Sequence, residues 1–179
     1  ETVLVIGAGP MGLAHIALSK LRGAGLVAVS EPNAMRRDRA TAIGADLAVD
    51  PMGDGIETFL ERTNGRGADV VIEAVGNPQT YTQAFKIVRR GGRILAYGAA
   101  PPDAEIGVKP FDIYAKELTI VGSYAGTYET WPEAIDRISG GRFDPGQVVD
   151  SVKPLSDVAD AIESMERDKS VVKVQVQIA

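Results

Sequence analysis

The sequence contains no cysteine and only one histidine among its 179 residues. Without cysteine, this chain cannot form a disulfide, a thiolate metal site, an iron–sulfur cluster or a catalytic cysteine. The lone His15 lies in a helical stretch, where a histidine is more often a packing or surface residue, and it cannot bind a metal unaided. The composition is consistent with a cytoplasmic protein, and we expect no metal site within these residues.

A surplus of positive charge and long apolar runs are also lacking. Basic residues number 19 and acidic residues 24, which gives a formal net charge of −5. Such a chain does not attract nucleic acid or an anionic membrane as a whole, so we expect neither as a partner. No apolar run approaches the roughly 18 residues of a membrane span, and no signal-peptide pattern is present. Any anionic ligand must therefore be bound locally.

Glycine, by contrast, is abundant, with 20 residues, and short apolar runs alternate with helical patterns along the chain. This alternation is typical of a parallel sheet covered by helices on both faces. The expected strands are residues 3–6, 26–29, 47–49, 69–75, 93–97 and 118–121. We therefore predict an α/β fold, a doubly wound Rossmann domain whose six-stranded parallel sheet has the order 3-2-1-4-5-6.

The remaining segments are of a different kind. A helix over residues 78–89 is expected to end before a Gly91-Gly92 turn, and residues 98–116 to form a loop-rich insert. The end of the chain is predicted to be a helix and strand extension. Its last strand alternates strictly from Val172 to Ile178, which indicates an antiparallel or edge environment. We expect residues 1–140 to form the dinucleotide-binding domain and residues 141–179 a separate C-terminal segment.

A glycine-rich turn follows the first strand directly. The sequence from Gly7 to Gly12 fits G-x-G-x-x-G, with a strand before it and a helix after it. The first glycine permits a tight turn, Gly9 lets the backbone approach a pyrophosphate, and the last allows close helix–strand packing. Pro10 suits the first helical position because its missing N–H is dispensable there. We predict that Gly7, Gly9, Pro10, Met11 and Gly12 hold a dinucleotide at the helix N-terminus.

An acidic residue follows at the end of the second strand, about 20 residues after the turn, as this fingerprint requires. This residue, Glu31, can accept hydrogen bonds from both ribose hydroxyls and would repel a 2′-phosphate, which favours NAD over NADP. Arg36 and Arg37 leave NADP open, because either arginine could pair with a 2′-phosphate. The alternative for these arginines is a solvated helix face shared with Arg39.

Two more glycine turns lie where strands of this fold end. Val75-Gly76 closes the fourth strand and Tyr97-Gly98 the fifth. Ligands of open α/β sheets bind in the crevice beyond such carboxyl ends, so these turns are expected to line the nicotinamide side. The alternative is that both are simple strand-ending turns.

The residues that hydride transfer would need are missing. The proton of an alcohol must be managed by a bound metal or by a Tyr, Lys or His acid/base. The sequence has no H-x-x-x-H, no acidic cluster at ligand spacing and no Y-x-x-x-K. The cofactor half of a dehydrogenase is therefore present, and the catalytic half is not.

These motifs together resemble the C-terminal part of zinc-type medium-chain dehydrogenases/reductases, the branch of alcohol, sorbitol, butanediol and threonine dehydrogenases. The resemblance rests on Val3 to Gly12 (VLVIGAGPMG), Ser30-Glu31-Pro32, Arg36-Arg37, Gly44-Ala45-Asp46, Asp50-Pro51, Glu73 to Gly76, Gly91-Gly92-Arg93, Leu118 to Ser123 (LTIVGS) and Thr130-Trp131-Pro132. It implies an NAD-binding domain of an enzyme that acts on a small alcohol or polyol.

The resemblance implies further roles for individual segments. Backbone groups around Val75, Gly98, Ser123 and Ala125 would contact the nicotinamide or its ribose. The insert near residues 105–109 would pair with its copy in a homodimer or homotetramer. The zinc ligands of the family lie in an N-terminal catalytic domain without a counterpart here, and the tail from residue 141 would pack with that domain.

Three interpretations remain open at this point. The first is the cofactor domain of an NAD-dependent or NADP-preferring alcohol dehydrogenase, inactive by itself. The second is a non-enzymatic nucleotide-sensing domain, which would keep the fingerprint without catalytic residues. The third, a methyltransferase, fits less well because it would not need Gly12 to admit a pyrophosphate.

Overall fold

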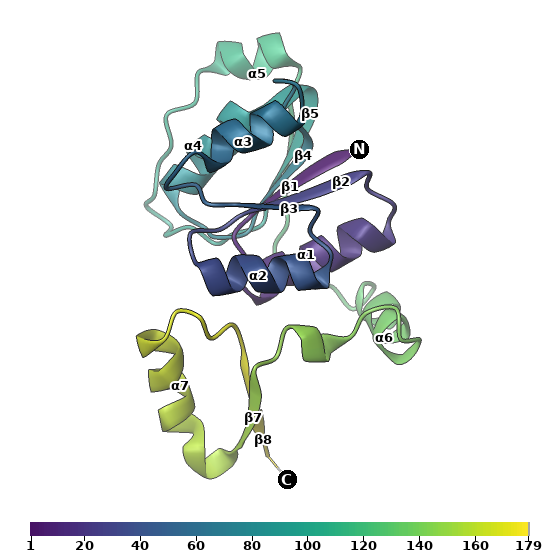
Figure 1. Cartoon of the computed structure of the whole chain (residues 1–179), viewed down its shortest axis with the longest axis vertical. Coiled ribbons are helices and arrows are strands. Elements are labelled where there is room, and N and C mark those ends of the chain that lie inside the picture. The colour runs from purple at the N-terminus through teal and green to yellow at the C-terminus, as the bar shows by residue number, and fades with distance from the viewer. Residues whose placement is uncertain (179) are drawn as a thin grey trace. The chain divides into compact units, whose positions relative to one another are not determined.

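The computed structural model describes residues 1–178, which divide into two compact units on either side of the Ala125–Gly126 peptide bond. Figure 1 shows the first unit as a sheet with helices on both faces. Its strands are β1 (Thr2–Ile6), β2 (Leu26–Ser30), β3 (Leu47–Val49), β4 (Ala68–Glu73), β5 (Val88–Ala96) and β6 (Thr119–Gly122). Their order is β3-β2-β1-β4-β5-β6 and every neighbouring pair is parallel, which confirms the predicted fold class.

Helices connect these strands and bury both faces of the sheet. They are α1 (Pro10–Leu21), α2 (Ala34–Ile43), α3 (Gly55–Arg62), α4 (Pro78–Ile87) and α5 (Pro110–Lys116). The first two lie on one face of the sheet and α3 and α4 on the other (Figure 1). The chain crosses from one side of β1 to the other between β3 and β4, so β1 and β4 are the neighbouring strands from which the two halves of the sheet diverge.

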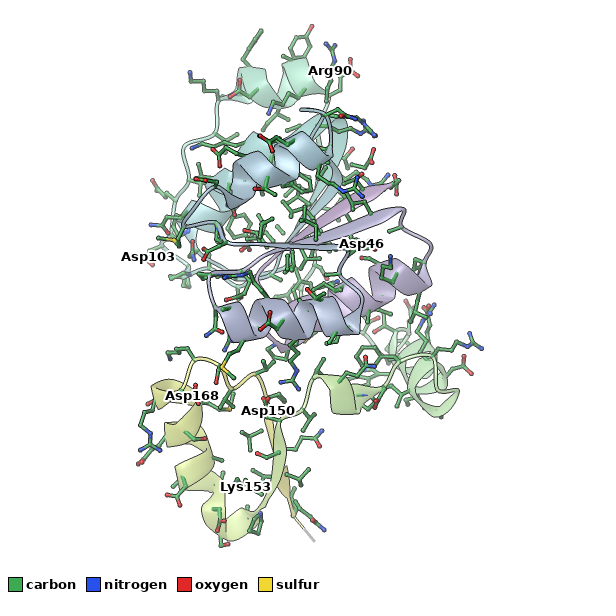
Figure 2. The ribbon with its side chains drawn as sticks, in the orientation of Figure 1. Asp46, Arg90, Asp103, Asp150, Lys153 and Asp168 are labelled. Atoms are coloured by element: carbon green, nitrogen blue, oxygen red, sulfur yellow. The ribbon has the colours of Figure 1, made fainter. Side chains whose placement is uncertain are left out.

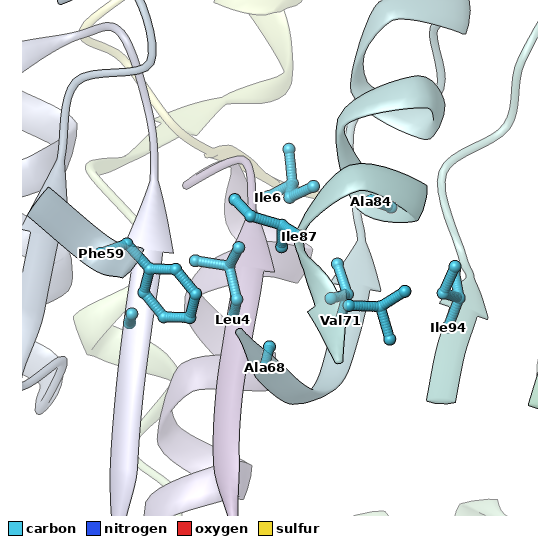
Figure 3. Close-up of a cluster of buried hydrophobic side chains, with 10 residues drawn as sticks. Leu4, Ile6, Phe59, Ala68, Val71, Ala84, Ile87 and Ile94 are labelled. Atoms are coloured by element: carbon cyan, nitrogen blue, oxygen red, sulfur yellow. The ribbon is translucent and has the colours of Figure 1, made fainter. Parts of the chain in front are cut away.

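The core follows from the alternation of side chains along the strands. Leu4 and Ile6 of β1 belong to a buried cluster that includes Phe59 of α3 and Ile87 of α4 (Figure 3). Val5, between them, is equally buried and faces the opposite side of the sheet. Each such side chain stabilises the fold by roughly 1.5–3 kcal/mol through burial. The burial of β1 on both faces explains why its sequence is a nearly continuous apolar run.

The structure corrects two expectations about the middle of the chain. The helix predicted over residues 78–89 ends at Ile87, and β5 begins at Val88, before the Gly91-Gly92 turn. The turn lies within β5, and the register of β5 against β4 shifts between the Ala68–Val88 and Val70–Arg93 pairs. The insert predicted as loop-rich contains α5, whose proline at its first helical position predefines the required backbone angle.

The second unit contains α6 (Trp131–Ser139), β7 (Ser151–Pro154), α7 (Val158–Arg167) and β8 (Val174–Gln177), with short 3₁₀ turns before β7 and α7. The two strands form a sheet of their own and run parallel to one another. The antiparallel arrangement considered for the last strand is therefore wrong, whereas its edge position is correct, because each strand of a two-stranded sheet is an edge. The predicted division into a dinucleotide-binding domain of residues 1–140 and a segment of residues 141–179 that packs against a further domain stays a prediction.

Candidate functional site

The glycine turn after β1 is built by close backbone packing. Gly7 adopts a φ of +97°, and its N–H donates to the Ser30 carbonyl oxygen at 2.8 Å. A Cβ on Gly7 would lie 2.6 Å from Cγ2 of Val75, and one on Gly12 would lie 2.0 Å from the carbonyl oxygen of Gly7. Both contacts are closer than atoms allow, so the first and last glycines are required by the fold itself.

The middle glycine has a different environment. A Cβ on Gly9 would meet no atom within 4 Å. Gly9 is also the N-cap of α1, no side chain caps this helix end, and Pro10 occupies its first turn. Met11 follows with 47% of its surface exposed. The first turn of α1 therefore presents backbone N–H groups and the positive end of the helix dipole to open space, an arrangement that suits an anion.

The end of β2 places Glu31 against this turn. Its side chain is only 5% exposed. One carboxylate oxygen accepts the Ala8 N–H at 2.8 Å, and the other accepts the Asn33 N–H at 2.9 Å. A carboxylate has about four acceptor positions, so two remain for a ligand. The predicted acidic residue and the glycine turn are thus joined directly, and the carboxylate also fixes the backbone of the turn.

The two arginines after Glu31 have separate surroundings. Nη1 of Arg37 donates to the carbonyl oxygens of Glu31 and Pro32 at 2.8 and 2.7 Å, and it lies 3.2 Å from Oδ2 of Asp50 at the end of β3. The expectation of a solvated helix face is therefore wrong for Arg37, which is held at the carboxyl ends of β2 and β3. Arg36 is half-buried in the first turn of α2.

Glu73, the last residue of β4, is a part of the site that sequence reasoning did not single out. Its side chain is completely buried. One carboxylate oxygen accepts the N–H groups of Val75 and Gly76, both at 3.0 Å. An acidic residue at the end of an otherwise apolar buried strand was the signal that could have identified it, because a buried charge needs dedicated partners.

Glu73 also contacts the turn after β5, because its backbone carbonyl oxygen accepts the N–H groups of Tyr97 and Gly98 at 3.1 and 2.7 Å. A Cβ on Gly98 would lie 2.3 Å from the Gly76 nitrogen and 2.4 Å from Oε2 of Glu73, so the two turns are in close contact. The Tyr81 hydroxyl donates to the Gly98 carbonyl oxygen at 2.7 Å. Burial, and then the nearby Glu73 carboxylate, raise the pKa of Tyr81 above its ordinary value, so this hydroxyl stays protonated at neutral pH.

Ser123 and Ala125 follow β6, two strands beyond β4. The Ser123 N–H donates to the carbonyl oxygen of Ala96 at 3.1 Å, and Ala125 has a left-handed φ of +53°. Both residues are exposed. They lie on the same carboxyl edge of the sheet as the other predicted residues, at the end farthest from Glu31.

His15 faces the interior. Its ring packs edge-on against Tyr97, with 4.6 Å between ring centroids, and burial lowers its pKa below 6.5. The residue is therefore a neutral packing group at pH 7. Among residues 1–178, no three His, Cys, Asp or Glu side chains come together as metal ligands, and no helix of that range is long and apolar enough to cross a membrane. The cytoplasmic location stays a prediction.

A doubly wound parallel sheet with a glycine turn between β1 and α1 and an acidic residue after β2 defines the class of Rossmann-type nucleotide-binding domains. Within that class the chain belongs to the zinc-binding dehydrogenase family, because the model of this family, described as "Zinc-binding dehydrogenase", matches residues 10–140.

The chain is similar to scyllo-inosose 3-dehydrogenase of Thermotoga maritima, with 34% identity over 97% of this chain and 45% of that protein. It superimposes on alcohol dehydrogenase TADH from Thermus sp. ATN1 with a TM-score of 0.93, at 28% identity, over 100% of this chain and 51% of the other.

Two similar structures contain nicotinamide cofactors. One is a short chain alcohol dehydrogenase from E. coli CFT073 in complex with NADH, with TM-score 0.89, 27% identity and coverage of 99% and 52%. The other is a protein from Sinorhizobium meliloti 1021 bound to NADP, with TM-score 0.85, 30% identity and coverage of 90% and 48%. The chain thus spans about half the length of the proteins it matches.

Proposed function

We propose that this chain is the NAD(H)-binding part of a zinc-dependent alcohol or polyol dehydrogenase, which transfers hydride between a secondary alcohol and the nicotinamide. The observation that carries the proposal is the Glu31 carboxylate, held at 2.8 Å from the Ala8 N–H beside the open N-terminus of α1. This arrangement supports the proposal, because a carboxylate can accept from ribose hydroxyls and helix N–H groups can donate to a pyrophosphate. Family membership and the NADH complex of a similar protein support the assignment.

Each part of the site then has a task. The first-turn N–H groups of α1, around Pro10 and Met11, hold the pyrophosphate, and the open space at Gly9 admits it. Glu31 accepts hydrogen bonds from the adenosine ribose. The turns at Val75-Gly76 and Gly98 orient the nicotinamide ring, and the backbone near Ser123 and Ala125 contacts its ribose. Bound NAD supplies the carbon that accepts the hydride.

The preference for NAD over NADP follows from the charge of Glu31. A 2′-phosphate would lie against its carboxylate, and like charges at such a distance repel strongly in a partly buried site. The alternative is an NADP-preferring enzyme in which Arg36 pairs with the phosphate, as the NADP complex of a similar protein allows.

The zinc ligands and the substrate pocket are proposed to lie on a part of the enzyme outside these residues. We assign no step of proton transfer to residues 1–178. We therefore expect the 179-residue chain to bind cofactor and to show no alcohol oxidation alone.

Calorimetry with NADH, NADPH and ADP-ribose tests the proposal. NADH and ADP-ribose are expected to bind, and NADH more tightly than NADPH. Glu31→Gln should weaken NADH by about tenfold, the value of one charge-assisted hydrogen bond, while weakening NADPH less. Glu57→Gln, on the exposed side of α3, is the matched control. Tighter binding of NADPH to the unmodified chain would refute the NAD assignment, and binding without turnover in the intact protein would favour a nucleotide sensor.

We also propose that the enzyme is a homodimer, or a homotetramer built from such dimers. The support is β6, the outermost strand of the sheet, whose four residues are all exposed. Ile120 and Val121 on this strand are 44% and 48% exposed. An apolar, unpaired edge strand is a surface that proteins normally cover, and residues 105–109 of the neighbouring insert would contribute to the same interface.

A further inference from the structure

Arg37 is held away from solvent by groups at the ends of two adjacent strands. Only 21% of its side chain is exposed, although it belongs to the first turn of a surface helix. Its Nη1 donates to the backbone carbonyls of Glu31 and Pro32, and the carboxylate of Asp50 lies 3.2 Å from the same atom. The guanidinium is thereby fixed beside the backbone of Glu31, the residue assigned to the ribose.

Asp50 is itself oriented by its own loop. Its Oδ1 accepts the N–H of Met52 at 2.9 Å, which leaves Oδ2 to face Arg37. The carboxylate is 41% exposed, so the attraction is partly screened by solvent and is modest in energy. Its effect is mainly on position, because it places an anion beside the same Nη1 that donates to the carbonyls of Glu31 and Pro32.

We propose that Asp50 is a specificity-determining residue, which withholds Arg37 from the ribose 2′ position and so favours NAD over NADP. The inference rests on the proposed function, and deepens it. A guanidinium is the side chain best suited to pair with a phosphate. Two backbone carbonyls accept from Nη1 of Arg37 and the Asp50 carboxylate lies beside the same atom, so these contacts hold the guanidinium in place and partly offset its charge.

The consequence is that removal of the Asp50 carboxylate should weaken the hold on a guanidinium that already lies beside Glu31. Asp50→Asn keeps an oxygen for the Met52 N–H but puts an amide where the partner of Arg37 was. The guanidinium can then turn toward a 2′-phosphate. The charge of Glu31 stays, so the change in preference should be partial.

The experiment measures the dissociation constants of NADH and NADPH for the full chain and for four variants: Asp50→Asn, Asp54→Asn, Arg37→Met and the double variant Asp50→Asn/Arg37→Met. Asp54 is exposed on the same loop and caps no helix N–H with its side chain, so its variant carries the same charge change away from Arg37. Thermal unfolding verifies that each variant folds, and Arg37→Gln replaces Arg37→Met if the latter does not.

The expected result is that Asp50→Asn lowers the ratio of the NADPH to the NADH dissociation constant by about threefold to tenfold. Asp54→Asn should change this ratio by less than about twofold, as should the Asp50 substitution in the Arg37→Met background. An unchanged ratio in Asp50→Asn overturns the inference. An equal decrease in the double variant also overturns it, because the effect would then not pass through Arg37. Failure of the unmodified chain to bind ADP-ribose would instead refute the proposed function.

Discussion

At the scale of single residues, the three glycines of the turn have different reasons to be glycine. Gly7 and Gly12 leave no space for a Cβ, since their neighbours are a valine methyl and a carbonyl oxygen of the protein itself. Gly9 faces open space. The sequence pattern predicted a distinct task for each, and the structure separates the two that the fold needs from Gly9, whose role toward a ligand stays a prediction.

This separation gives a matched pair of variants. Gly12→Ala should lower the free energy of unfolding by about 1–3 kcal/mol, because the new methyl group overpacks the strand–helix contact. Gly9→Ala should change that free energy by less than about 1 kcal/mol, since its φ of −71° suits alanine and only the N-cap preference is lost. Urea titration and ADP-ribose calorimetry measure both. Gly9→Ala should weaken ADP-ribose by about tenfold or more, and unweakened binding would contradict the role assigned to Gly9.

The buried Glu73 shows where residue-level prediction stops. The local sequence pattern predicts Glu31 as a site residue, because one strand–helix–strand unit fixes its distance from the glycine turn. The partners of Glu73 are backbone N–H groups two and three residues later and a turn from the next strand. That arrangement depends on how two loops fold against one another, which no spacing rule contains.

At the scale of secondary-structure elements, the long periodic segments were predictable and the boundaries set by tertiary contacts were not. The strands and the first crossover helix follow from the alternation, and the strand order follows from the doubly wound class that the alternation indicates. The change from α4 to β5 at Val88 could not be predicted in this way. Val88 fits the helical pattern, but it pairs with Ala68 of β4 instead. The parallel pairing of β7 and β8 was likewise hidden, since an alternating pattern fits either direction.

The exposed edge strand gives a prediction at this scale. Val121→Asp on β6 places a charge on the proposed dimer interface and should shift the molecular mass in solution from dimer to monomer. Unfolding should be little affected at low protein concentration, because Val121 is half-exposed within one chain. Analytical ultracentrifugation measures the shift, with Val152→Asp on the exposed strand β7 as control. A monomeric parent chain would contradict the proposed homodimer.

At the scale of the whole first unit, the ion pairs of Asp69 and Asp46 lie at the end of the sheet opposite to the proposed ligand-binding groups. Asp69 at the start of β4 accepts the Thr2 N–H and contacts the guanidinium groups of Arg66 and Arg89. Asp46, before β3, pairs with Lys20. Asp46 and Asp103 mark opposite sides of this unit in Figure 2. Glu31, Glu73 and the glycine turns lie at the carboxyl ends of the strands.

The loss of stability of the fold in acid should originate at the amino ends of the strands, at Asp69. Burial acts to raise the pKa of Asp69, but the Thr2 N–H and the two arginines outweigh it and hold the pKa below 3.8. Its contribution is therefore complete above the unfolded-state pKa of about 3.9 and is lost as pH falls through the lower folded-state pKa. Asp69→Asn should cost about 2–4 kcal/mol at pH 7, because Asp69 is buried and its arginine partners lose their anion.

Denaturant titrations from pH 7 to pH 2.5 measure this difference. The stability gap between the parent chain and Asp69→Asn should narrow as the pH is lowered. Asp103→Asn, at an exposed position, should follow the parent chain throughout. A gap that stays constant down to pH 2.5 would contradict a lowered pKa of Asp69.

The division of the sheet into two ends has a practical meaning for redesign. Substitutions that stabilise the chain can be confined to the amino ends of the strands, around Asp69 and Asp46, without touching a group that meets a ligand. Changes of ligand preference belong to the opposite end, where Glu73 holds the turn after β4 through its carboxylate and the turn after β5 through its backbone carbonyl. Those two loops must therefore be exchanged together when a loop from a relative is grafted into this scaffold.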